Sequence, residues 1–110
     1  MREYTDNRVP TFDPELLRYK TVEEFLESVR RGSEIVIEWK GIEYGIDYLR
    51  NIVPKLETDK AYSISQCGTK EVYIATEMQC DTPEELLEYS LGGDRLGDVI
   101  TQVIVCERTF

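Results

Sequence analysis

Apolar and polar residues alternate through most of residues 34–49, on both sides of Lys40 and Gly41. Alternation of this kind is typical of strands with one buried face, and a central glycine suits a two-residue turn that needs positive φ. The pattern therefore predicts a β-hairpin. Its register pairs only apolar residues on one face: Trp39 with Ile42, Ile37 with Tyr44 and Ile35 with Ile46. We expect this face to lie on the hydrophobic core, with Trp39 as a buried anchor.

The opposite face of the same hairpin is acidic. The register sets Glu38 opposite Glu43 and Glu34 opposite Asp47. Like charges directly opposite each other destabilise a sheet by roughly 0.2 to 1 kcal/mol per pair, so folding alone gives no reason to place them there. These four carboxylates are therefore the first candidate binding residues.

A second hairpin is predicted from residues 61–66 and 70–77, around a three-residue loop with Gly68 at positive φ. This loop length puts four apolar residues on the core face: Tyr62, Ile64, Val72 and Ile74. Four polar residues would then share the exposed face with the acids: Ser63, Ser65, Glu71 and Tyr73. A tyrosine on an open polar sheet suits protein recognition, because it supplies contact area at low entropic cost. Tyr73 and Glu71 thus join the candidate partner-binding residues.

Two capping boxes predict helices, each with a threonine that accepts from a backbone amide and a glutamate that reaches back. The first box begins at Thr21 and is followed by an apolar stripe at helical spacing and by Gly32 as a left-handed exit. The second begins at Thr82 and predicts a helix that runs to Gly92 and Gly93. Asp94 is expected to cap a third helix, whose end is open because residues 103–105 also fit a strand.

The remaining segments have weaker patterns. Residues 1–20 read as an N-terminal arm with a short helical turn after Asp13, and residues 50–60 as a long connection that is a second-rank functional candidate. The expected fold is α+β in one domain, residues 1–110, with its core in residues 21–110. It has a four-stranded antiparallel sheet of two hairpins, with two to three helices covering one face.

The charge balance excludes several function classes. The chain holds 22 acidic and 13 basic residues and no histidine, which leaves a net charge of −9. Direct nucleic-acid binding is disfavoured because polyanions are repelled, whereas a basic protein partner is favoured. Without histidine, nucleophilic triads and most general-base arrangements are missing, and no phosphate loop is present. We therefore expect a protein that is not an enzyme and that uses no cofactor.

The three cysteines, Cys67, Cys80 and Cys106, include no C-x-x-C pair. An odd number without such a pair fits a reducing compartment better than a disulfide framework, and we expect buried, inert thiols, with one reactive or metal-bound thiol as the alternative. No metal site is expected, since a fourth zinc ligand and histidine are both lacking. The apolar runs are too short for a membrane span or a secretory signal, so we expect a cytoplasmic protein.

Four motifs carry a resemblance over residues 20–105. They are T-x-E-E-F-L from Thr21, G-x-E-I-x-I-x-W-x-G-x-x-Y from Gly32, T-P-E-E-L-L from Thr82 and G-x-x-L-x-D-V from Gly93. Their order resembles small acidic α+β proteins of bacterial accessory and mobile-element genes. Proteins of this kind are similar to immunity proteins that neutralise a basic toxin or nuclease, or to phage-encoded anti-CRISPR proteins.

The resulting hypothesis is an acidic inhibitor that binds a basic protein partner, either a toxin, a nuclease or another nucleic-acid-binding effector, in the manner of an immunity protein. One alternative is a phage anti-defence protein that imitates nucleic-acid charge. An alternative from another class is a structural or dimerisation module that uses the open sheet face to form a homodimer.

Overall fold

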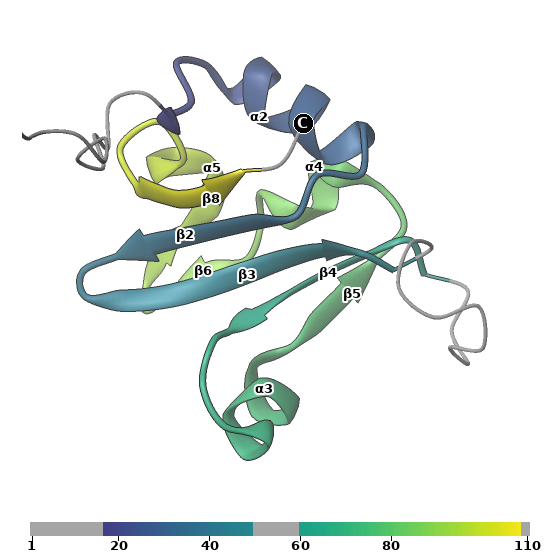
Figure 1. The fold of residues 1–110 in the computed structure, drawn as a ribbon, viewed down its shortest axis with the longest axis vertical. Coiled ribbons are helices and arrows are strands. Elements are labelled where there is room, and N and C mark those ends of the chain that lie inside the picture. The colour runs from purple at the N-terminus through teal and green to yellow at the C-terminus, as the bar shows by residue number, and fades with distance from the viewer. Residues whose placement is uncertain (1–16, 50–59, 109–110) are drawn as a thin grey trace, which may run out of the picture.

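The structure is a computed structural model that describes residues 17–49 and 60–108. The expected helical turn after Asp13 and nearly all of the 50–60 connection lie outside these ranges. The described chain has the predicted α+β class: an antiparallel sheet with helices gathered mainly on one side of it (Figure 1).

The central hairpin forms in the predicted register. Its strands are β2, Ile35–Trp39, and β3, Ile42–Tyr48. Lys40 and Gly41 have φ values of 53° and 85°, and positive φ at both central residues is the mark of a type I′ turn. The cross-strand pairs match the sequence prediction: Ile35 with Ile46, Ile37 with Tyr44, Glu38 with Glu43 and Trp39 with Ile42.

Three further strands extend the hairpin into a five-stranded sheet of order β5-β4-β3-β2-β8. They are β4, Tyr62–Gln66, β5, Met78–Cys80, and β8, Ile104–Arg108. The prediction of four strands is therefore wrong, because the end of the chain, left open between helix and strand, forms β8 beside β2. Both strands of the central hairpin thus have a paired neighbour on each side.

Helix α2, Val22–Arg30, forms from the first capping box as predicted. The Thr21 hydroxyl accepts from the Glu24 amide at 3.0 Å, and the Glu24 carboxylate accepts from the Lys20 amide at 2.7 Å. Gly32, with φ of 83°, provides the left-handed exit into β2. The helix packs through the predicted stripe, of which Phe25, Leu26 and Val29 are buried.

The hydrophobic core lies between the sheet and a layer of short elements on one side of it (Figure 1). With α2, this layer holds α4, Pro83–Leu86, β6, Ser90–Leu91, β7, Asp94–Arg95, and α5, Leu96–Val99. Side chains with little or no exposure come from both layers: Phe25, Ile35, Ile37, Ile46, Ile64, Leu86, Leu91, Leu96, Ile100, Val103 and Val105. The predicted apolar face of the hairpin therefore does lie on the core.

The helix expected to run from Thr82 to Gly92 is shorter than predicted. It ends at Leu86, and Gly92 and Gly93 instead form the turn of the small β6–β7 hairpin. Leu86 and Leu91 are both buried but are five residues apart, which puts them on different faces of a continuous helix. Breaking the helix lets both reach the core.

The predicted second hairpin is the largest error. Residues 70–76 form a helix, α3, Lys70–Thr76, beyond the ends of β4 and β5, and β4 pairs with β5 (Figure 1). The Thr69 hydroxyl caps α3 by accepting from the Val72 amide at 3.2 Å. A strand here would have buried Ile74, whereas this side chain is 64% exposed and no residue of α3 is buried.

Trp39 is half-buried rather than a buried anchor, because it lies at the turn end of the hairpin, where Ile42 opposite it is 39% exposed. Its indole Nε1–H donates to Asp94 Oδ2 at 2.9 Å. Asp94 also pairs with Lys40 at 3.0 Å and does not cap the third helix, whose N-cap is Arg95. The tip of the central hairpin is thus held by polar contacts.

Arg108 joins the end of β8 to α2. Its guanidinium pairs with Glu24 at 2.8 Å, donates to the Leu17 carbonyl at 2.7 Å and lies 4.1 Å from the centroid of the Tyr19 ring. The hydrogen bond from Arg108 is the main reason why the pKa of Glu24 is lowered. These contacts hold residues 17–19 and the last strand against the same helix.

A pair of isoleucine truncations tests the helical assignment of residues 70–76. Ile64→Ala removes fully buried atoms and should lower the free energy of unfolding by about 2 to 5 kcal/mol. Ile74→Ala removes exposed atoms and should change it by less than about 0.5 kcal/mol. Urea unfolding followed by circular dichroism measures both, and an equal loss in the two variants would contradict the helix.

Candidate functional site

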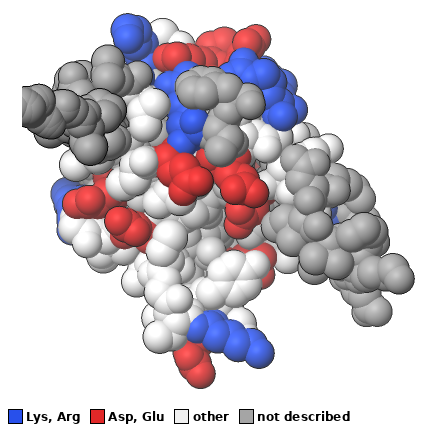
Figure 2. All heavy atoms as spheres, in the orientation of Figure 1, with Lys and Arg blue, Asp and Glu red and all other residues white. Residues whose placement is uncertain are grey.

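The acidic face is the sheet surface that carries Glu34, Glu38, Glu43 and Asp47, opposite the core. Glu34 and Glu43 are exposed, and Glu38 and Asp47 are half-buried. In the view of Figure 2, acidic side chains gather over the middle of the molecule, with basic side chains directly above them and others at the borders. Glu38 is the cross-strand partner of Glu43, and alternation along β3 puts Asp47 on the same side as Glu43. Glu34 directly precedes β2, and its charge acts on Asp47.

Glu38 and Glu43 are direct cross-strand partners. Within the described ranges, no lysine or arginine lies within ion-pair distance of Glu38, Glu43 or Asp47. The nearby lysines pair elsewhere: Lys40 with Asp94 at 3.0 Å and Lys60 with Asp81 at 3.2 Å. The negative charge on the acidic face is therefore not compensated by these neighbours.

Asp47 lies close to other acids. Burial raises the pKa of its carboxyl, and the negative charges of Glu34 and Glu77 raise it further. Glu77 is a member of this group that sequence reasoning missed, because residues 70–77 were assigned to a strand with Glu77 at its end. Repulsion by neighbouring carboxylates in the folded state favours the protonated form of Asp47, or its ionised form together with a bound cation.

Tyr73 reaches the border of the acidic face from α3. Its hydroxyl donates to Glu77 at 2.8 Å, and the same carboxylate accepts from Ser63 at 2.9 Å and Gln79 at 3.1 Å. Burial opposes ionisation of Glu77, but these hydrogen bonds outweigh it and lower the pKa. Tyr73 is 38% exposed, so its ring remains open to a partner.

The other polar residues expected on this surface are placed differently. Ser63 and Ser65 are buried, with exposures of 1% and 6%, and are not available to a partner. Glu71 is exposed on α3 and makes no hydrogen bond or ion pair with the described residues. Of the expected residues, the structure thus brings Tyr73 close to Asp47, beside its hydrogen-bond partner Glu77.

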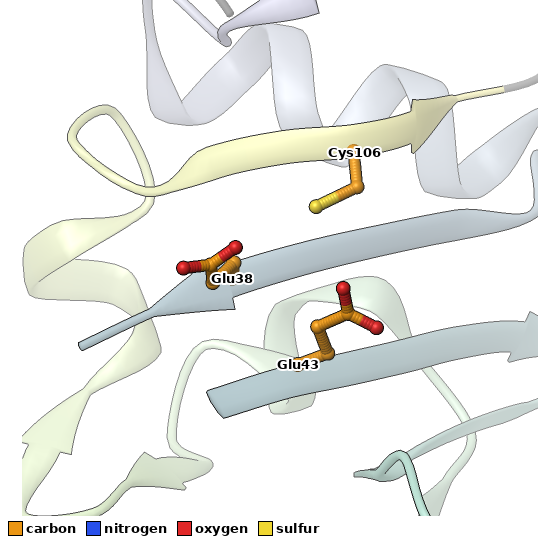
Figure 3. A group of neighbouring side chains, drawn as sticks. All are labelled: Glu38, Glu43 and Cys106. Atoms are coloured by element: carbon orange, nitrogen blue, oxygen red, sulfur yellow. The ribbon is translucent and has the colours of Figure 1, made fainter. Parts of the chain in front are cut away.

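A thiol also lies among the acids. Cys106 on β8, Glu38 on β2 and Glu43 on β3 project from the same side of three neighbouring strands (Figure 3). The Cys106 sulfur and one carboxylate oxygen from each glutamate all lie within 4.8 Å of one another. Burial raises the pKa of the Cys106 thiol, and the charges of Glu43 and Glu38 add to this effect.

The prediction of three buried thiols is confirmed only for Cys80. This residue is buried, and burial raises its pKa to about 11. Cys106 is half-buried, and Cys67 is exposed because it follows the end of β4. Burial and the charge of Glu43 raise the pKa of Cys67 as well.

The chemistry of this surface is that of a cation acceptor. It offers carboxylate oxygens and a thiol, and the chain has no histidine to act as a base near neutral pH.

Neither a family model, nor a curated protein, nor a solved structure matches the chain. None of the described helices has the length and apolar character needed to cross a membrane. Function is therefore inferred from the geometry of the acidic face.

Asp47→Asn tests the electrostatics of this face. A raised pKa in the folded state means that folding favours protonated Asp47, so the wild type loses stability as pH rises from the ordinary aspartate pKa to the raised value. Asp47→Asn should therefore be more stable than the wild type at neutral pH. The difference should vanish below the ordinary aspartate pKa. Urea unfolding at a series of pH values measures this difference, and a difference independent of pH would contradict the expectation.

The exposure of the thiols predicts an order of alkylation. Iodoacetamide should modify Cys67 first in the folded protein, then Cys106, and should modify Cys80 only after unfolding in urea. Mass spectrometry of peptides at successive times identifies the modified residue. If Cys80 in the folded protein were modified as fast as Cys67, this would contradict its burial and show that β5 separates from β4.

Proposed function

We propose that this protein is a non-enzymatic acidic inhibitor that binds a basic surface of another protein through its acidic face. The single observation that carries the proposal is the direct opposition of Glu38 and Glu43, without an ion-pairing partner among the described residues. The form of this function that we favour is an immunity protein that neutralises a basic toxin or nuclease.

The energetics support a binding role for this pair. Directly opposed like charges destabilise a sheet by roughly 0.2 to 1 kcal/mol, and neither carboxylate makes an ion pair with the described residues that would offset this cost. Lysine or arginine side chains of a partner would neutralise them on binding. The stability lost in the free protein would then be recovered in the complex.

The charge of the whole chain supports a basic partner. A net charge of −9 attracts a positively charged surface over a distance and raises the rate of encounter with it. A nucleic-acid-binding groove is a surface of this kind, since it is lined with lysine and arginine. Tyr73 at the border of the acidic face adds aromatic contact area of the type found in protein interfaces.

The double variant Glu38→Gln/Glu43→Gln tests this proposal. Relief of repulsion should raise the free energy of unfolding by up to about 1 kcal/mol. Association with a basic nuclease recovered by the wild-type protein should slow by about tenfold at low salt and lose much of its salt dependence. Urea unfolding and surface-based association kinetics measure the two effects.

The matched control is Glu23→Gln/Glu27→Gln, which removes the same charge from exposed positions of α2, on the other side of the sheet. This control should keep most of the wild-type association rate. Equal slowing in both variants would show that only the net charge matters and would remove the assignment to the acidic face. Concentration-dependent self-association without any basic partner would favour the dimerisation module instead.

A further inference from the structure

We propose that Cys106, Glu38 and Glu43 form a binding site for a divalent cation that prefers sulfur-containing sites, of which Zn²⁺ is the main biological example. This inference goes beyond the proposed binding of a basic protein, called the docking function below, and does not depend on it. It rests on the convergence of a thiol and two carboxylates, which come from three different strands.

The spacing of the donor atoms suits a small cation. All three lie within 4.8 Å of one another, and ligands of tetrahedral zinc at their usual bond lengths lie about 3.4 to 3.6 Å apart. Rotation of the two glutamate side chains is enough to close this difference. The three strands are hydrogen-bonded neighbours, so the backbone already holds the donors on one surface (Figure 3).

An irregularity in β8 helps to place the thiol. The register between β8 and β2 shifts between Val36 and Ile37, so that Val36 pairs with Glu107 while Ile37 pairs with Val105. Cys106 is the extra residue between these pairs, which is the arrangement of a β-bulge. Bulges of this type are common next to functional sites, because they redirect a side chain. Here the bulge keeps Val105 on the core and Cys106 on the acidic face.

The thiol decides the class of ion. Two carboxylates alone would suit Mg²⁺ or Ca²⁺, which take oxygen ligands and usually need more of them. A thiolate favours Zn²⁺, and Co²⁺ can report on the same site. Binding replaces the thiol proton, which leaves to solvent, with the metal. Three protein ligands leave a fourth position for water, on the side where Glu43 is exposed.

A second sulfur lies on the same surface. Cys67 directly follows β4, its amide donates to the Glu43 carbonyl at 2.8 Å, and its Sγ would lie 3.7 Å from a Cβ atom placed on Gly45. Gly45 stands between Glu43 and Asp47 in β3, and its missing side chain leaves room for this thiol. Cys67 is not one of the three converging donors, which makes it a natural control for the role of Cys106.

Cobalt titration of the reduced, metal-stripped protein tests the proposal. The wild type should bind one Co²⁺ per chain with a thiolate-to-cobalt absorption band in the near ultraviolet, and Zn²⁺ should displace it. Removing a residue that only hydrogen-bonds to a metal ligand already lowers metal affinity by about 10- to 100-fold. Removing a ligand itself, in Cys106→Ser, should therefore lower the Co²⁺ affinity by at least about 100-fold and remove the band. Glu38→Gln/Glu43→Gln should also weaken binding.

Two controls make the result specific. Cys67→Ser and Glu23→Gln/Glu27→Gln should keep the band and the affinity of the wild type. Circular dichroism without metal should show that every variant is folded. The absence of saturable Co²⁺ binding by the wild type would overturn the proposal, and so would a band that survives in Cys106→Ser. Because Cys106→Ser keeps the two carboxylates, it should leave binding to a basic protein intact, which separates this site from the docking function.

Discussion

The type I′ turn at Lys40 and Gly41 is the constraint on which the rest of the structure depends. A two-residue turn fixes which residues of β2 and β3 face each other, and side-chain alternation then assigns every residue of both strands to a face. Ile35 and Ile37 therefore go to the core, and Glu38 goes to the opposite surface. A slip of one residue would exchange the two faces, bury a carboxylate and expose the core. Strands β4 and β8 pair with the two outer edges of this hairpin. The faces of the hairpin therefore also decide which side of the sheet is the core side in β4 and β8.

The same register that stabilises the core also creates the electrostatic conflict on the acidic face. Glu38 and Glu43 repel each other, and the pKa of Asp47 is raised by burial and by neighbouring acids. The two proposed roles relieve this conflict in different ways. A basic protein would neutralise the carboxylates as a surface, whereas a metal ion would bind two of them together with the sulfur of Cys106. Replacing Cys106 should affect only the second role, because a neutral thiol adds no charge to a surface that binds a basic protein.

Sequence reasoning succeeded where the signal was local. The central hairpin and α2 depend on a turn, a capping box and an exit glycine, all of which lie within a few residues of the elements that they define. It failed at residues 70–77, where the alternation of Val72 and Ile74 imitates a strand. A short helix with no buried residue has no apolar stripe by which it can be recognised. The helix after Thr82 was extended too far, because only the packed core shows that Leu86 and Leu91 must both be buried.

By itself, the sequence determined the apolar and acidic faces of the central hairpin, the pairing of Glu38 with Glu43 and the negative charge of the chain. These follow from alternation, a two-residue turn and composition, which need no knowledge of distant contacts. Only the tertiary structure decided that β8 pairs with β2 and brings Cys106 to the two glutamates. The spacing of residues along the chain does not predict this contact. Strand pairing between distant segments is instead selected by the burial of Val105 and its neighbours in the core.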